Sequence, residues 1–423
     1  MNHVETGAPR TPLEQRLATL RGGAPQRGLD ARALAALAAN PGCRRRAVLD
    51  AAGVDKAALA TSLGRPAPFG QSPFAISRGL GFEKRVTADG CAELLQLLRQ
   101  HLGLPAPHDQ ADDDSPVEIP TLVTDPKRPA ERVASTRAAL VRAAALPGVW
   151  TLLDHPLLRL DVAGSAAHLE PDLIVVRPDG RWTVVEIKSF PILDGSADPA
   201  KVGAAARQAA VYVLALRATA AELAGSATGG NPGDSPFNPY LEPVGPAGAP
   251  TGTALLVCPK DFSNRPTAAA IDVRKPMAVT RRQLDRLTRI EELLDTLPPG
   301  TAFALDGSRS GEQLTAAVAG MDAAYSPDCL STCELAFHCR NEARCAGSVE
   351  VLGRSVRGEL GSVRTVEDAL AAAGATASSA TASATGDETA ARLAHAAALR
   401  AEALAGAGVH AGAGAEPGAG ARG

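Results

Sequence analysis

Residues 157–188 read LLRLDVAGSAAHLEPDLIVVRPDGRWTVVEIK, and this stretch decides the fold of the chain. It contains three short runs rich in Leu, Ile and Val, at Leu157–Val162, Leu173–Arg177 and Thr183–Lys188. The turn-forming segments AGS at 163–165 and PDG at 178–180 separate these runs. Short apolar runs bounded by Gly, Pro, Asp and Ser are typical of β-strands joined by tight turns. The stretch therefore predicts a three-strand meander.

The sequence on either side of the meander predicts helices and one further strand. Helical patterns cover residues 129–146, the Ala-rich residues 201–224 and the Arg-rich residues 279–297. Residues 253–258 (TALLVC) indicate a strand. The order helix, three strands, helix, strand predicts an α/β fold with a mixed central sheet flanked by helices.

Composition divides the rest of the chain. Residues 1–30 are polar and rich in Pro and Gly, which predicts a loosely ordered N-terminus. Residues 31–118 predict a helical region, with helices over 31–62 and 82–102. We expect the core over 119–300 and a cysteine-rich region over 301–365. Residues 366–423, rich in Ala, Gly, Ser and Thr, predict a low-complexity tail with a short helix near 387–406.

Overall composition narrows the class of protein. The 423 residues are 45% hydrophobic, which is ample material for a buried core. The formal net charge is -3, so a basic signature for nucleic-acid binding would have to be local. No run approaches the roughly 18 apolar residues of a membrane-spanning helix. The polar first residues also lack the apolar run of a signal peptide, which predicts a cytoplasmic protein with no membrane partner.

Two carboxylates and a lysine mark the candidate chemistry. Asp172 precedes the second expected strand, and Glu186 and Lys188 lie two residues apart on the third. Residues i and i+2 of a strand project from the same face, and a hairpin brings the start of one strand near the end of its partner. Carboxylates are the ligands of Mg²⁺ or Mn²⁺, and a lysine beside them can act on a water or on transition-state charge.

The motif order resembles the RecB-like branch of the PD-(D/E)XK nuclease superfamily. Pro171-Asp172 and Glu186-Ile187-Lys188 match its core motifs, and Gln208 and Tyr212 match its helical Gln-x-x-x-Tyr motif. The resemblance implies a restriction-endonuclease-like core in which Asp172, Glu186 and the backbone carbonyl of Ile187 bind the divalent metal. It also implies that Lys188 acts on the water or the transition state, while Gln208 and Tyr212 position the substrate or the lysine.

The family has a further metal ligand on an upstream helix. The segment SRGLGFE at 77–83 resembles the glycine-then-acid pattern found there, so Glu83 is the candidate. Glu131, on the helix nearer to the meander, is a rival. His168 and Glu170, just before Asp172, are further candidates. The alternative for each of these four residues is an ordinary polar residue.

Four of the seven cysteines lie within 17 residues, as Cys329-x3-Cys333-x5-Cys339-x5-Cys345. Such a cluster favours metal ligation, and thiolates suit either an iron–sulfur cluster or zinc. The arrangement, with Cys43 upstream, resembles the [4Fe–4S] nucleases of the AddB and CRISPR-associated exonuclease type. That resemblance implies Cys43, Cys329, Cys333 and Cys339 as ligands, although the family spacing is usually C-x2-C-x5-C. Cys345 is the substitute ligand, and Cys91 and Cys258 are expected to be buried core thiols.

These patterns predict a metal-dependent deoxyribonuclease with Mg²⁺ or Mn²⁺ and an iron–sulfur cluster, serving DNA repair or phage defence. Its partner is single- or double-stranded DNA. The sequence contains no Walker-type motif, so a helicase or other protein would have to supply any unwinding. Two alternatives remain. One is a nuclease-fold module that binds DNA or protein without cleavage, and the other is a zinc-stabilised regulatory protein in which the motif is accidental.

Overall fold

The computed structural model describes residues 11–66, 73–102, 115–125, 128–162, 165–193, 195–228, 249–287, 290–374 and 388–412. The chain divides into two compact units, each described by itself. The first comprises Met1–Ala324 and Ser331–Leu335, and the second comprises Tyr325–Leu330 and Ala336–Gly423. Among the described residues, no helix is long and apolar enough to cross a membrane.

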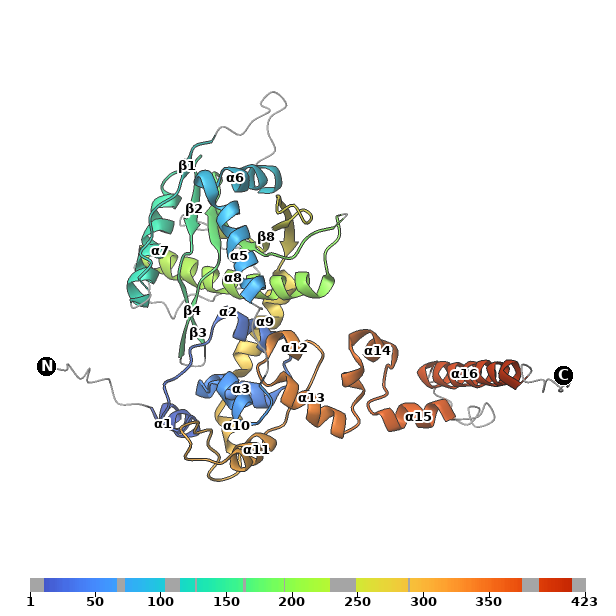
Figure 1. Cartoon of the computed structure of the whole chain (residues 1–423). Coiled ribbons are helices and arrows are strands. Elements are labelled where there is room, and N and C mark those ends of the chain that lie inside the picture. The colour runs from blue at the N-terminus through green and yellow to red at the C-terminus, as the bar shows by residue number, and fades with distance from the viewer. Residues whose placement is uncertain are drawn as a thin grey trace, which may run out of the picture. The chain divides into compact units, whose positions relative to one another are not determined.

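The first unit contains most of the regular structure (Figure 1). Its helices are α1 (Pro12–Leu20), α2 (Ala31–Ala39), α3 (Arg44–Ala52), α4 (Lys56–Ser62), α5 (Pro73–Val86), α6 (Ala88–Leu102), α7 (Pro129–Ala144), α8 (Pro199–Thr228), α9 (Arg274–Leu287), α10 (Ile290–Asp295) and α11 (Gly311–Ala319). Its strands are β1 (Val117–Glu118), β2 (Trp150–Asp154), β3 (Leu158–Val162), β4 (Ser165–Leu169), β5 (Leu173–Val176), β6 (Arg181–Ile187), β7 (Ala249–Pro250), β8 (Thr253–Pro259) and β9 (Pro266–Asp272).

The central sheet has the order β1-β2-β5-β6-β8-β9, and the short β7 also pairs with β6. Strands β1 and β2 are parallel, and β5 is antiparallel to both β2 and β6. Strands β6 and β8 are parallel, and β8 and β9 are antiparallel. The sheet is therefore mixed. Helices cover both of its faces, which confirms the expected α/β class.

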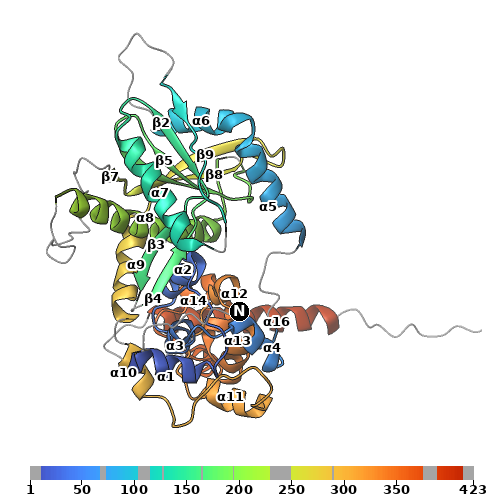
Figure 2. The ribbon, with the colours of Figure 1, turned by 90° about the vertical axis from the view of Figure 1, so that its left-hand side faces the viewer.

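The two faces of the sheet are buried by different helices. Side chains of α7 and α8 pack against Leu153, Ile174 and Val184. Side chains of α5 and α6, among them Phe82 and Leu94, pack against the alternate strand residues on the other face. Figure 2 shows α7 and α8 on one side of the strands and α5 and α6 on the other. Because strand side chains alternate between faces, each strand residue belongs to one of these two cores.

The prediction that Leu157–Val162 forms the first strand of the central meander is wrong. In the described part of the chain, Leu158–Val162 is β3, which pairs with β4 in a separate two-stranded hairpin, and β2 takes its place beside β5. Burial explains the difference. Residues 150–153 of β2 are all buried, as a strand covered on both faces requires, whereas β3 alternates buried Leu158 with exposed Arg159.

The expected region boundaries also differ from the structure. Within residues 1–30, Pro12–Leu20 forms α1, which begins with a Thr11–Glu14 capping box and buries Leu17 and Leu20. The expected helical region 31–118 is not separate, because α2, α5 and α6 share the cores of the sheet. The expected cysteine-rich region 301–365 is divided between the two units.

The second unit is helical, and within the expected tail Glu388–Gly412 confirms the predicted helix near 387–406. Its helices are α13 (Ala336–Cys345), the 3-10 helix η1 (Val349–Leu352), α14 (Arg354–Glu359), α15 (Val366–Gly374) and α16 (Glu388–Gly412), and α12 (Cys329–Thr332) has residues in both units. A small core of Val349, Leu360 and Val363 packs against Val366 and Leu393. Residues 375–387 and 413–423 lie outside the described residues.

Candidate active site

Glu186 and Lys188 lie at the end of β6, on the face covered by α8. The Glu186 side chain is completely buried, and Lys188 Nζ lies 2.5 Å from its Oε2. Burial raises the pKa of Glu186 to about 7, with a contribution from Asp172, and the ammonium of Lys188 opposes this rise. The two carboxylates raise the pKa of Lys188 above its ordinary value despite its burial. The lysine is therefore held in its charged form beside two acids.

Asp172 is brought to the same place by the register of the β5–β6 hairpin. Leu173 pairs with Val185, so Asp172 lies one step beyond the last pair, opposite Glu186. The Asp172 Oδ2 atom accepts a hydrogen bond of 2.6 Å from the backbone N–H of Ile187. Burial raises the pKa of Asp172, while Lys188 and the Ile187 N–H act to lower it. The hairpin thus fixes the geometry expected from the sequence spacing.

Helix α8 brings Gln208 and Tyr212 to this face. Gln208 Nε2 donates a hydrogen bond of 3.1 Å to the Tyr212 hydroxyl, as the i,i+4 spacing allows. Burial and the nearby Glu186 carboxylate raise the pKa of Tyr212. Tyr212 is therefore a neutral hydroxyl close to the two acids, supported by the Gln208 amide.

Glu83 reaches the site from α5 through a histidine that sequence reasoning missed. His155 Nε2 lies 3.0 Å from Glu83 Oε1, and the negative charge of Glu83 contributes to raising the pKa of Asp172. The hydrogen bond to Glu83 raises the pKa of His155 to about 9, against its burial. His155 directly follows β2. A polar Asp-His pair immediately after a buried apolar run was the signal that could have identified it.

Glu170 approaches the other ring nitrogen of His155. Its Oε1 is 3.7 Å from His155 Nδ1 and 2.9 Å from Arg132 Nη2. Arg132 Nη2 also donates to the backbone carbonyl of His155, at 3.2 Å. The backbone N–H of His155 in turn donates to the carbonyl of Asp172, at 3.1 Å. This network holds the left-handed turn at His155, where φ is 44°, beside the start of β5.

Two of the sequence candidates are not brought to the carboxylates. Glu131 is exposed on α7 and pairs with Arg128, at 3.0 Å. His168 is exposed on β4, opposite Arg159 in the two-stranded hairpin. Glu83, and not Glu131, is thus the helical acid near Asp172.

The seven cysteines all lie in the described part of the chain, and none forms a disulfide. Cys43 is half-buried at the start of α3, Cys329, Cys333 and Cys339 are buried, and Cys345 is exposed. Cys43 and Cys333 belong to the first unit, while Cys329 and Cys339 belong to the second. The iron–sulfur ligand set therefore stays a prediction. Cys91 and Cys258 are buried as expected, and burial raises the pKa of Cys258 to about 12.

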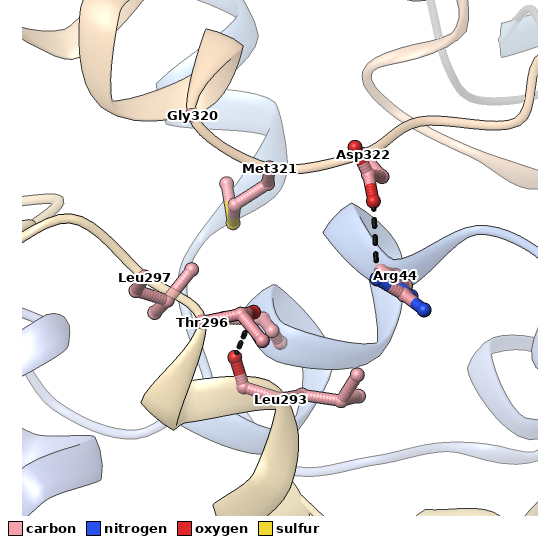
Figure 3. A pocket seen from close by; sticks show the side chains of 8 residues that line it. Arg44, Leu293, Thr296, Leu297, Gly320, Met321 and Asp322 are labelled. Carbon is pink, nitrogen blue, oxygen red and sulfur yellow. Dashed lines mark hydrogen bonds and ion pairs between the residues drawn. The ribbon is translucent and has the colours of Figure 1, made fainter.

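Within the described residues, no three side chains of His, Cys, Asp or Glu are already arranged as a metal site. A pocket of about 130 Å³ lies elsewhere in the first unit, where Leu293, Leu297 and Met321 meet and Arg44 pairs with Asp322 (Figure 3). It shares no residue with the group around Glu186. Comparison with family models, curated proteins and solved structures finds no match to the chain.

Proposed function

We propose that the chain is a metal-dependent deoxyribonuclease, and that its first unit has a restriction-endonuclease-like core of the RecB-like branch. One observation carries the proposal. Asp172, Glu186 and Lys188 occupy one end of the β5–β6 hairpin, with the buried Glu186 held 2.5 Å from an ammonium. Burying a carboxylate costs several kcal/mol, roughly, unless charge or hydrogen bonds offset it. A fold that retains a buried acid beside a second, half-buried one favours a functional site over a structural one.

The donor set suits a hard divalent cation. Oxygen ligands suit Mg²⁺ and Mn²⁺, and Asp172, Glu186, the Ile187 carbonyl and Glu83 would supply them. Oε1 of Glu186 is buried and has no hydrogen-bond partner among the described residues, so a cation would satisfy it. When bound, the metal would lower the pKa of a ligated water and neutralise charge on the scissile phosphate.

The remaining residues have roles that follow from their positions. The Lys188 ammonium would orient the attacking water and stabilise negative charge that develops on the phosphate. Tyr212, neutral and hydrogen-bonded to Gln208, would position Lys188 or a substrate oxygen without competing for the cation. His155, through its contact with Glu83, would hold that carboxylate toward Asp172.

Incubation of the purified full chain with single- and double-stranded DNA tests this proposal. We expect cleavage with Mn²⁺ or Mg²⁺, none with a chelator, and loss of cleavage in Glu186→Gln. The variant has nearly the same shape but lacks the charge that binds the metal. DNA binding without cleavage by the wild-type chain would support the non-cleaving module instead. Cleavage that persists in Glu186→Gln would refute the assigned site.

A further inference from the structure

A second polar pocket lies at the opposite end of the same strands. It has a volume of about 330 Å³, and its lining includes Arg177, Arg181 and Arg274. Arg177 directly follows β5 and Arg181 begins β6, whereas Glu186 lies five residues further along β6. At about 3.3 Å per residue, that separation is roughly 17 Å along the strand. This arginine pocket is therefore distinct from the candidate active site.

In the described part of the chain, the charged side chains around the arginine pocket include more cations than anions. Arg177 is half-buried, with its side chain 13% exposed, while Arg181 and Arg274 are exposed. Two acids face them. Asp179 lies 3.1 Å from Arg177 and 3.9 Å from Arg181, and Asp272 lies 2.6 Å from Arg274. Among the residues that the structure describes here, three guanidinium groups thus meet two carboxylates.

One hydrogen-bond donor of Arg177 in the pocket has no acceptor among the described residues. Nε of Arg177 is buried and has no hydrogen-bond partner in the part of the chain that is described. Burial lowers the pKa of Arg177, with Asp179 opposing this shift and Arg181 adding to it. A buried charged donor without a hydrogen bond costs free energy, so an anion that accepts this hydrogen bond would stabilise the folded protein.

Neighbouring hydroxyls and a glycine shape the wall. Thr183 and Thr251 hydroxyls lie 3.3 Å apart, and the Thr251 hydroxyl donates to the Thr253 carbonyl at 2.7 Å. Gly252 lies between Thr251 and Thr253 in the chain. A Cβ at Gly252 would meet Cγ of Arg274 at 2.7 Å, so the absence of a side chain lets the Arg274 stem pack against the strand end.

We propose that the arginine pocket binds a phosphate group, either as inorganic phosphate or as the monoester of a nucleotide-sized ligand. Guanidinium groups match phosphate oxygens with paired, charge-assisted hydrogen bonds. The volume lies at the small end of the range for ligand pockets, roughly 300–1,000 Å³, which fits a mononucleotide. This ligand would be separate from the DNA that the proposed nuclease site at Glu186 would bind.

Titration calorimetry of the full chain at constant ionic strength, with inorganic phosphate and with adenosine monophosphate, tests the proposal. We expect saturable one-site binding. Arg181→Gln and Arg274→Gln should each weaken it about tenfold or more, because each removes a charge-assisted hydrogen bond. Both side chains are exposed, so the fold should persist. Arg159→Gln is the matched control, since Arg159 also pairs with an acid two residues away and is not in the pocket.

Tighter binding of the nucleotide than of phosphate would identify a nucleotide site, and equal binding would identify a site for the phosphate group alone. Absence of saturable binding for both ligands would overturn the proposal. Equal weakening by Arg159→Gln would overturn it too, because the effect would then come from overall charge. The measurement involves no cleavage, so its failure and the failure of the proposed nuclease activity are distinguishable.

Discussion

His155 Nε2 lies 3.0 Å from Glu83 Oε1, so the end of strand β2 is joined to helix α5 beside the candidate active site. The two residues are 72 positions apart in the chain. The contact connects the helix over one face of the sheet with the hairpin that carries Asp172.

Replacing His155 should weaken metal binding more than it disturbs the fold. In His155→Gln, Glu83 loses the charged partner that orients it. Partners of metal ligands typically contribute about 10- to 100-fold to metal affinity or activity. We therefore expect a rise of that size in the Mg²⁺ concentration that gives half-maximal cleavage. His168→Gln is the control, and an equal rise in that variant would contradict the assignment.

Glu83 should be required for cleavage and Glu131 should not. Glu83→Gln removes a carboxylate that acts on Asp172, whereas Glu131→Gln removes only a surface pair with Arg128. We expect Glu83→Gln to lose more activity than His155→Gln, and Glu131→Gln to match the wild type. Initial rates at saturating Mn²⁺ compare them. The reverse ranking of the two glutamates would show that the wrong helix was assigned.

Asp50 should be a major determinant of stability in the first unit. Its carboxylate is completely buried between Arg46, at 3.0 Å, and Lys56. Asp50→Asn would remove the nearest counter-charge of Arg46 and Lys56 and leave Glu334, which lies 3.8 Å from Lys56, as the remaining acid. Breaking such a buried pair costs about 3–5 kcal/mol. Urea unfolding measures this loss. Asp55→Asn removes a more exposed pair with Arg27, keeps the capping oxygen of α4, and should cost about 1 kcal/mol or less.

The same network predicts how stability depends on pH. Burial alone would raise the pKa of Asp50, but Lys56 and Arg46 together lower it below its ordinary value of 3.8. The folded state therefore favours the ionised carboxylate. This contribution is present above the unfolded pKa and is lost as the pH falls through the folded pKa. The stability difference between wild type and Asp50→Asn should shrink in acid, and a constant difference would contradict this account.

Cysteine variants should separate the cofactor ligands from the bystanders. If the spacing reflects a [4Fe–4S] cluster, protein purified without oxygen will be brown and contain iron and acid-labile sulfide. Single Ser replacements of Cys43, Cys329, Cys333 or Cys339 should lower iron content, while Cys91→Ser should not. Cys345→Ser tests the substitute ligand. A colourless chain with stoichiometric zinc would replace the iron–sulfur assignment with a zinc site.

Much of the candidate site could be predicted because it depends on short-range patterns. The hairpin between Asp172 and Glu186 is set by a tight turn and two apolar strands, so spacing alone places the acids together. Gln208 and Tyr212 follow from helical periodicity in the same way. The mixed sheet between helices was also predictable, because the order of elements constrains how they pack.

The errors arose where distant parts of the chain decide the structure. Leu158–Val162 has the composition of a strand, but only its neighbours determine that it pairs outside the central sheet. Trp150–Asp154 was missed because a short run buried on both faces has no alternating pattern. His155 was missed for a related reason, since its role depends on Glu83, which helix α5 brings from far upstream.

Comparison of DNA cleavage by the wild-type chain and Lys188→Ala, with Mn²⁺ or Mg²⁺, tests the central claim most directly. Lys188 Nζ lies 2.5 Å from Glu186, and groups that act on the attacking water typically contribute about 10²- to 10⁴-fold to the rate. We predict metal-dependent cleavage by the wild type and a loss of that size in the variant. Cleavage at an unchanged rate in Lys188→Ala would contradict the assigned active site.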